Sequence, residues 1–331
     1  MKFTQLIATF VLVLLQFCST AQSMVGVTGM ADTSYSNRSA AASIRKSHPN
    51  AVLVESAKLA TVKEKYNLTY CQVGDRKLQL DVFHPTAKSK AKKTAILIIH
   101  GGGWRSGNRT QHHALAQKLA GLGYVCFTPE YRLSTEALYP AAVYDLKAAL
   151  RWIRKHAKAY GIDTAKVAVI GFSAGGQLAA LLGTTNGNKK FEGESCQLGF
   201  SSAAQAIIDL DGTLSFVHPE SGEGDDSKKT SAATYWFGYS KKENTGLWQK
   251  ASPLTHVGKN TPPTLFINSS VARMHAGRDD FMKVMKEHNI YTDVKTFDDA
   301  PHHFPMFEPW FTPMVQTIDD FLKTVFRTKN N

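Results

Sequence analysis

Apolar runs near the start of the domain predict a hairpin followed by a buried strand. Residues 66–73 and 77–85 have the composition of two strands, and a Gly-Asp turn separates them. Residues 94–100 form an almost unbroken apolar run that ends at Gly101. A continuous run of this kind is typical of a strand buried on both faces of a sheet. We therefore expect an antiparallel pair and then a central strand.

Amphipathic and apolar segments alternate along the rest of the chain. The pattern predicts helices at 111–123, 141–161, 173–183 and 309–326, and strands at 124–131, 166–171, 204–212, 263–270 and 292–301. Strands that alternate with helices after a hairpin indicate an α/β fold, with a mostly parallel twisted sheet and helices on both faces. In such sheets the active site lies beyond the carboxyl ends of the strands.

The first 50 residues are predicted to lie outside this domain. Residues 1–21 have the form of a signal peptide, with a lysine, a short apolar stretch and small residues before a cleavage site near Ala21. We therefore expect a secreted or periplasmic protein, with a retained anchor as the alternative. Residues 22–50 are rich in small residues and lack periodicity, which predicts a linker. The catalytic domain is expected at 51–331.

Composition narrows the expected partners. The formal net charge is +12, and a basic cluster at 87–93 contributes to it. A positive charge of this size favours attraction to an anionic polymer. A secreted chain without a nucleic-acid motif is not expected to bind nucleic acid. No membrane contact is expected after signal cleavage, and the oligomeric state is not specified. Cys71, Cys126 and Cys196 allow at most one disulfide, and their spacing suits no metal site.

The segment "GFSAGG" at 171–176 follows an apolar strand and opens a helix. It places Gly171, Ser173 and Gly175 in the G-x-S-x-G pattern. In a nucleophile elbow this pattern forms a strained turn that exposes the serine above the sheet. The alternative is an ordinary strand-to-helix turn. The strand before the motif and the helix after it favour the elbow.

Two further motifs supply the other parts of an acyl-transfer site. "HGGGW" at 100–104 follows a buried strand, and its glycines let backbone N–H groups approach a substrate oxygen closely. With the N–H of Ala174 they would form an oxyanion hole, whereas His100 is expected to be a structural hydrogen-bonding residue. "APHHF" at 300–304 lies where the base belongs in a Ser, acid, His order. His302 is the predicted base and His303 its neighbour.

These motifs together resemble the α/β-hydrolase superfamily, and within it the secreted carbohydrate-esterase-like branch. That branch contains acetylxylan, feruloyl and pectin esterases. The resemblance spans about residues 65–327 and rests on "LDVFHP", "HGGGW", "GFSAGGQLAALLGTT", "ASPLTHV" and "APHHF". It implies a serine nucleophile, a histidine base and three oxyanion-hole N–H groups. These residues are Ser173, His302, Gly102, Gly103 and Ala174. No cofactor is implied.

The chain departs from the family pattern at the triad acid. In relatives an aspartate follows the strand equivalent to "PTLFIN", but here that stretch reads "NSSVARMHAG" and contains no carboxylate. The next carboxylates are Asp279, which is the predicted acid, and Asp280. The rival is Asp209 or Asp211, at the end of the preceding strand. A serine–histidine pair without an acid also remains open.

Residues 211–250 are long for a connection and are predicted to form a lid insertion. About half of their large aromatic residues are expected to pack in the core, and the rest to form a lid or a wall on which sugars stack. These residues are Phe216, Trp236, Phe237, Tyr239 and Trp248.

The motifs predict a secreted serine esterase that acts on a plant-type polysaccharide, with acetyl esters favoured. The base would take the serine proton, protonate the leaving sugar hydroxyl and then activate water. A pectin methylesterase and a feruloyl esterase are the alternatives within this class. A non-catalytic binding protein with an α/β-hydrolase fold is the alternative from another class.

Overall fold

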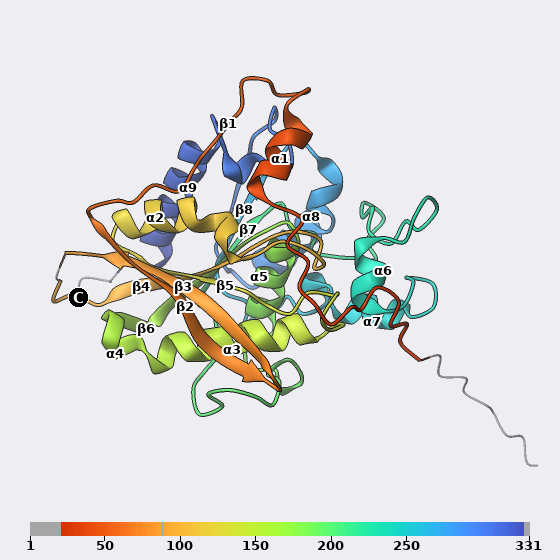
Figure 1. Ribbon diagram of the computed structural model, residues 1–331, viewed down its shortest axis with the longest axis horizontal. Coiled ribbons are helices and arrows are strands. Elements are labelled where there is room, and N and C mark those ends of the chain that lie inside the picture. Colours follow the sequence, from red (N-terminus) through yellow and green to blue (C-terminus); the bar gives the residue numbers. More distant parts are fainter. Residues whose placement is uncertain (1–20, 88, 328–331) are drawn as a thin grey trace, which may run out of the picture.

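The centre of the molecule is an eight-stranded sheet (Figure 1). The computed structural model describes residues 21–87 and 89–327, so the predicted signal peptide lies outside the described residues except for Ala21. The strand order is β2-β3-β5-β4-β6-β7-β8-β9, and β3 runs antiparallel to both of its neighbours, whereas the other adjacent pairs are parallel. The strands are β2 (Val62–Val73), β3 (Arg76–Pro85), β4 (Lys93–Ile99), β5 (Val125–Pro129), β6 (Ile162–Phe172), β7 (Ala206–Leu210), β8 (Thr264–Asn268) and β9 (Thr292–Thr296).

Helices cover both faces of the sheet and form two apolar layers with it. The layer on one face includes α3 (Ala141–Lys155), α5 (Ala174–Thr184) and α8 (Arg278–Glu287), and the layer on the other includes α1 (Asn37–Ile44), α2 (His113–Gly121) and α9 (Phe311–Val325). In α9, buried Phe311, Met314, Ile318 and Leu322 recur every three or four residues, which gives one apolar face. The predicted α/β-hydrolase architecture is confirmed.

Short elements connect these layers. They are β1 (Val52–Leu53), α4 (Ala157–Tyr160), α6 (Ala232–Phe237), α7 (Thr245–Lys250), β10 (Phe307–Glu308), and the 3₁₀ helices η1 (Arg109–His112), η2 (Lys189–Phe191), η3 (Pro253–Thr255), η4 (Ala272–His275) and η5 (Phe304–Met306). Strands β1 and β10 form a separate antiparallel pair. None of the helices within residues 21–87 and 89–327 combines the length and apolar character needed to span a membrane.

The predicted linker at 22–50 is wrong, because part of it forms α1 and packs on the domain (Figure 1). Ser36 caps α1 with its side chain, and Ala40 and Ile44 are buried against the sheet layer. Before the helix, the Gly107 N–H donates to the Asp32 carbonyl at 3.0 Å. A helix of eight residues with two buried positions is too short to show periodicity in a Ser- and Ala-rich stretch.

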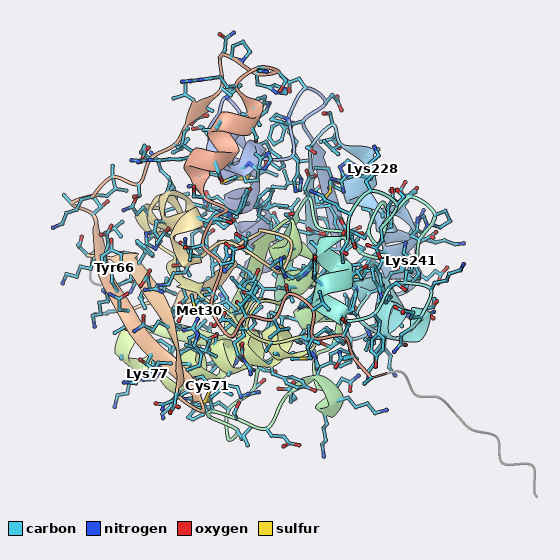
Figure 2. All side chains as sticks on the ribbon, turned by 45° about the vertical axis from the view of Figure 1, so that its right-hand side comes forward. Met30, Tyr66, Cys71, Lys77, Lys228 and Lys241 are labelled. Carbon is cyan, nitrogen blue, oxygen red and sulfur yellow. A yellow bond between two sulfur atoms is a disulfide. The ribbon has the colours of Figure 1, made fainter. Side chains whose placement is uncertain are left out.

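The insertion at 211–250 is held to the domain by its aromatic residues. Four of these residues are fully buried, namely Phe216, Trp236, Phe237 and Trp248, whereas Tyr239 is half-buried. The Trp236 ring stacks on Trp104 from the "HGGGW" loop, with ring centroids 5.0 Å apart. These four buried rings are core residues, which excludes them from a sugar-stacking wall. Lys228 and Lys241 belong to the outer part of the insertion (Figure 2).

A disulfide joins Cys71 of β2 to Cys196, a separation of 125 residues (Cys71 is marked in Figure 2). Cys126 is a buried free thiol in β5, and burial raises its pKa well above its usual range. The bridge ties the edge hairpin to the loop after η2, so it restrains the unfolded chain over a long loop.

We expect loss of this bridge to destabilise the protein by about 2–4 kcal/mol, because the unfolded chain regains the freedom of a long loop. The double variant Cys71→Ser/Cys196→Ser should therefore melt several degrees below the wild type in a thermal scan. Reductant should lower the wild-type melting temperature similarly and leave the double variant unaffected. Equal melting temperatures for the oxidised wild type and the double variant would contradict the assignment.

Candidate active site

Ser173 occupies a strained turn between β6 and α5. Its backbone has φ 56° and ψ −121°, a conformation that non-glycine residues rarely adopt. A Cβ atom added to Gly171 would overlap the carbonyl of Gly175, and one added to Gly175 would overlap the carbonyl oxygen of Ile99. The glycines of the motif are therefore required by the close approach of strand and helix. This is the geometry of the predicted nucleophile elbow.

His302 lies in the loop after β9 and contacts both other members of a triad. Its Nε2 is 2.9 Å from Ser173 Oγ, and its Nδ1 is 2.9 Å from Asp211 Oδ2. Because Nδ1–H donates to the carboxylate, Nε2 is free to accept the serine proton. His303 lies outside this relay, near Tyr35 with ring centroids 6.0 Å apart. Burial and then the neighbouring His302 lower the pKa of His303 to about 4.

The predicted acid, Asp279, is wrong. Its side chain is 82% exposed and pairs with Arg278 at 2.9 Å, at the start of α8. Asp280 is also exposed and faces His218. The acid that meets His302 is Asp211, the rival at the end of β7. The reason is the strand order, because β7 lies beside β6 and its carboxyl end is next to the elbow.

Asp211 is fully buried and remains ionised. Its backbone has φ 54°, a left-handed conformation that aspartate tolerates better than most residues. Its Oδ1 accepts the Ser269 N–H at 2.8 Å. Burial alone would raise the pKa of this carboxyl, but the nearby imidazoles of His275 and His302 outweigh that effect and hold the pKa at about 2. The charge that orients His302 is therefore present at any ordinary pH.

Asp209, the other rival, has a different place. It is fully buried, and its Oδ1 accepts the Gly212 N–H at 2.7 Å. Burial raises the pKa of this carboxyl well above its ordinary value. Asp209 thus fixes the turn that carries Asp211, and the structure records no hydrogen bond between it and His302.

The predicted oxyanion-hole residues lie in the glycine loop and at the start of α5. Gly103 and Ala174 line the small pocket at Ser173, and Ala174 opens α5, so its N–H has no partner within the helix. Gly102 lies in the turn beneath them, where its carbonyl accepts the N–H groups of Arg105 and Ser106. The pocket lining thus supports Gly103 and Ala174 as donors, and the Gly102 N–H stays a predicted donor.

His100 has the structural place expected of it. It is fully buried, its Nδ1 lies 2.8 Å from the Gly101 carbonyl, and its ring stacks on Tyr131 at 4.4 Å. Burial lowers the pKa of His100 to about 4, so the ring is neutral at physiological pH. It supports the glycine loop, and its burial keeps it from solvent.

The pocket at Ser173 is small and stiff. Its volume is about 70 Å³, whereas drug-sized ligands occupy pockets of about 300–1,000 Å³. Trp104 forms one wall, and its Nε1–H donates to Gln177 Oε1 at 2.9 Å. Met274 and Glu223 form other walls, and Glu223 lies 3.6 Å from Arg273. Neither residue could be predicted as part of the site, because Glu223 lies in a turn and Met274 in the short 3₁₀ helix η4.

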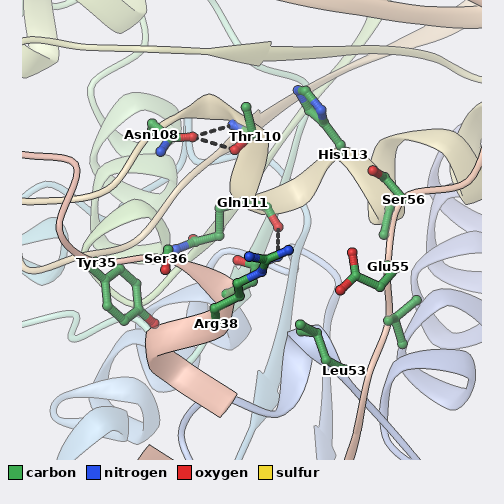
Figure 3. A pocket seen from close by; sticks show the side chains of 13 residues that line it. Tyr35, Ser36, Arg38, Leu53, Glu55, Ser56, Asn108, Thr110, Gln111 and His113 are labelled. Atoms are coloured by element: carbon green, nitrogen blue, oxygen red, sulfur yellow. Dashed lines mark hydrogen bonds between the residues drawn. The ribbon is translucent and has the colours of Figure 1, made fainter. Parts of the chain in front are cut away.

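Figure 3 shows a second cavity, of about 260 Å³. Its lining comes from residues 35–38, 53–56, 108, 110, 111, 113 and 114, and the triad is not part of it. Gln111 lies on its wall and connects it to the site, because Gln111 Oε1 accepts the Gly101 N–H at 2.7 Å. A residue of this cavity wall therefore helps to hold the glycine loop in place.

Comparisons with known proteins agree with this geometry. The BD-FAE family model matches residues 80–274, which is more than half of the chain. The chain is 29% identical over 242 residues to a probable carboxylic ester hydrolase, LipM, of Mycobacterium tuberculosis, covering 69% of this chain and 54% of that protein. It is 27% identical over 270 residues to esterase LipC of the same organism, covering 77% and 64%. The chain thus spans little more than half of these relatives.

Solved structures share the fold. A truncated carbohydrate esterase from gut microbiota superimposes with a TM-score of 0.68 at 22% identity, covering 81% of this chain and 100% of that one. A butyrate-bound esterase from Thermogutta terrifontis gives a TM-score of 0.66 at 24% identity, covering 82% and 97%. At these identities the likeness establishes an α/β-hydrolase fold.

We expect Asp211→Asn to lower ester turnover by about 10⁴-fold with the fold intact, because the histidine loses the charge that stabilises its imidazolium. Asp279→Asn, the matched exposed control, should change turnover less than twofold. Steady-state kinetics on a chromogenic ester, with circular dichroism to check folding, measures both. A silent Asp211→Asn beside a crippled Asp279→Asn would overturn the assignment of the acid.

Proposed function

The chain belongs to the BD-FAE family of α/β-hydrolase esterases, and on that premise we propose that it is a serine carboxylic ester hydrolase. The observation that carries the proposal is the continuous relay from Ser173 through His302 to Asp211, with both hydrogen bonds at 2.9 Å. A non-catalytic binding protein has no need of a strained serine aligned with an ionised carboxylate. The relay therefore favours an enzyme over a binding module.

The geometry supports a two-step acyl transfer. His302 Nε2 takes the Ser173 proton as Oγ attacks the ester carbonyl carbon, and the resulting oxyanion lies against the N–H groups of Gly103 and Ala174. The intermediate collapses, and His302 gives the proton to the leaving alcohol. Water then enters, loses a proton to the same nitrogen and attacks the acyl-serine carbonyl. The acid leaves, and Ser173 recovers its proton.

The size of the pocket supports a short acyl group, with acetyl first. A space of about 70 Å³ suits a methyl or ethyl group, whereas the aromatic ring of a feruloyl group needs far more room. The walls resist expansion, because Trp104 is held by Gln177 and by the ring of Trp236.

Pectin methyl esters fit this pocket less well than acetyl esters do. In a methyl ester of galacturonan the polymer itself is the acyl part, whereas in an acetylated sugar the polymer is the leaving alcohol. Only the second arrangement has a small acyl group that the pocket can hold.

The wider proposal is an enzyme that is secreted and removes acetyl groups from a plant-type polysaccharide. The signal-like N-terminus and the disulfide suit an oxidising compartment. The net charge of +12 suits a matrix that contains acidic polymers. The carbohydrate esterase among the structural neighbours supports a sugar as the alcohol.

Incubation with acetylated xylan and with methyl-esterified pectin tests the proposal. We expect acetate from xylan at a rate far above that of methanol from pectin, and we expect Ser173→Ala to lose at least about a thousandfold in rate. Methanol as the main product would favour a pectin methylesterase. No product from either polymer, together with no labelling of Ser173 by a fluorophosphonate, would favour the binding module.

A series of p-nitrophenyl esters tests the pocket. We expect kcat/KM to fall from acetate to butyrate to hexanoate, because each methylene that does not fit costs about 1–3 kcal/mol. Met274→Ala removes a pocket wall and should raise the hexanoate rate relative to acetate by about tenfold. Met282→Ala, a change outside the pocket, should leave this ratio unaltered. A flat chain-length profile in the wild type would contradict the small acyl pocket.

A further inference from the structure

A second imidazole faces the triad acid. His275 Nε2 lies 3.3 Å from Asp211 Oδ1, whereas His302 Nδ1 lies 2.9 Å from Asp211 Oδ2. Each oxygen of the carboxylate is therefore approached by its own histidine. His275 ends η4, in the "NSSVARMHAG" stretch after β8 that contains no carboxylate.

The surroundings of His275 leave its ring nitrogen available to the carboxylate. The His275 side chain is 15% exposed and that of Asp211 is 0% exposed, so water reaches their contact poorly. Among the described residues, Nε2 forms no aligned hydrogen bond, although it lies at ion-pair distance from Oδ1. Catalytic hydrogen bonds are often long in the absence of substrate and tighten when the reacting complex forms.

The carboxylate needs such support because its orientation determines whether Oδ2 can accept the hydrogen bond from His302 Nδ1. The torsion that turns an aspartate carboxylate is soft, so the carboxylate can rotate partly away from His302 unless both of its oxygens are held. The Ser269 N–H holds Oδ1 from one side at 2.8 Å. His275 approaches the same oxygen, and together they leave Oδ2 for His302.

We propose that His275 is a positioning residue for ester hydrolysis: its Nε2–H holds Asp211 Oδ1 so that Oδ2 stays directed at His302. The proposal rests on the proposed esterase function. By sharing the negative charge of Asp211, His275 also moderates how strongly this carboxylate stabilises the His302 imidazolium. Loss of His275 should therefore both loosen the triad and make His302 easier to protonate.

The charged groups near this contact are few among the described residues. Besides His302, the titratable groups nearest to Asp211 are Asp209 and His303. Further out are the pair formed by Glu223 of the insertion and Arg273 of η4, and Glu220, whose Oε2 accepts the Gly277 N–H at 3.2 Å. Glu220 in turn pairs with His218 at 3.3 Å. None of these carboxylates forms a recorded ion pair with His275, so Asp211 is the anion whose effect a substitution at His275 changes.

Two variants of similar volume separate positioning from packing. His275→Gln keeps an N–H donor near the place of Nε2, and His275→Leu fills the space without one. We expect His275→Leu to lower kcat by about tenfold with KM changed less than twofold, and to move the acidic limb of the kcat/KM profile to higher pH. His275→Gln should stay within about threefold of the wild-type kcat. His288→Ala, at the exposed end of α8, is the control that should change neither.

The outcomes are distinct. Equal losses in His275→Leu and His275→Gln, with an unmoved acidic limb and lower melting temperatures, would mean that His275 only packs, and would overturn the proposal. If His275→Leu fails to fold, a His275→Gln variant that loses tenfold or more in kcat would overturn it as well. A wild type without turnover of any ester would instead overturn the esterase function itself.

Discussion

Around Ser173 the backbones of β4, β6 and α5 approach so closely that only glycine fits between them. Side-chain atoms at Gly171 or Gly175 would overlap carbonyl oxygens of the neighbouring segments. This approach forces Ser173 into its strained conformation and sets the start of α5, and with it the N–H of Ala174, at the wall of the pocket. The positions of the base, the acid and the acyl pocket follow from where this turn places the serine hydroxyl.

Most of the sheet and the elbow could be predicted, because their signals are local. A buried strand followed by glycines and a helix is visible in ten or so consecutive residues, and "GFSAGG" is such a case. The acid could not be assigned in this way. Asp279 follows the loop in which relatives carry their acid, so the sequence favours it. Asp211 is the carboxylate that contacts His302, because β7 lies directly beside β6. Sequence order says little about which strand ends are neighbours.

The position of the acid also changes the task of the loop after β8. Since Asp211 follows β7, the loop at 269–277 does not supply the acid. This loop instead places Met274 in the pocket wall and His275 beside the carboxylate of Asp211. The short 3₁₀ helix η4 therefore contacts both the acyl pocket and the triad acid. The fully buried aromatic residues of the insertion act from the other side, where Trp236 stacks on Trp104. The sequence predicts burial for only about half of the large aromatic residues in the insertion, since a lid and a core use the same residue types.

The segment before α1 shows that the domain begins earlier than its composition suggests. Tyr35 N–H donates to Ser106 Oγ at 2.8 Å, and Asp32 pairs with the same loop, so this segment braces the turn that follows the oxyanion glycines. A boundary drawn at residue 50 from composition would cut away this brace. A protease that trimmed the chain to that point would remove no triad residue, yet it would leave the glycine loop open to solvent on its outer side. The functional unit therefore begins well before its first strand.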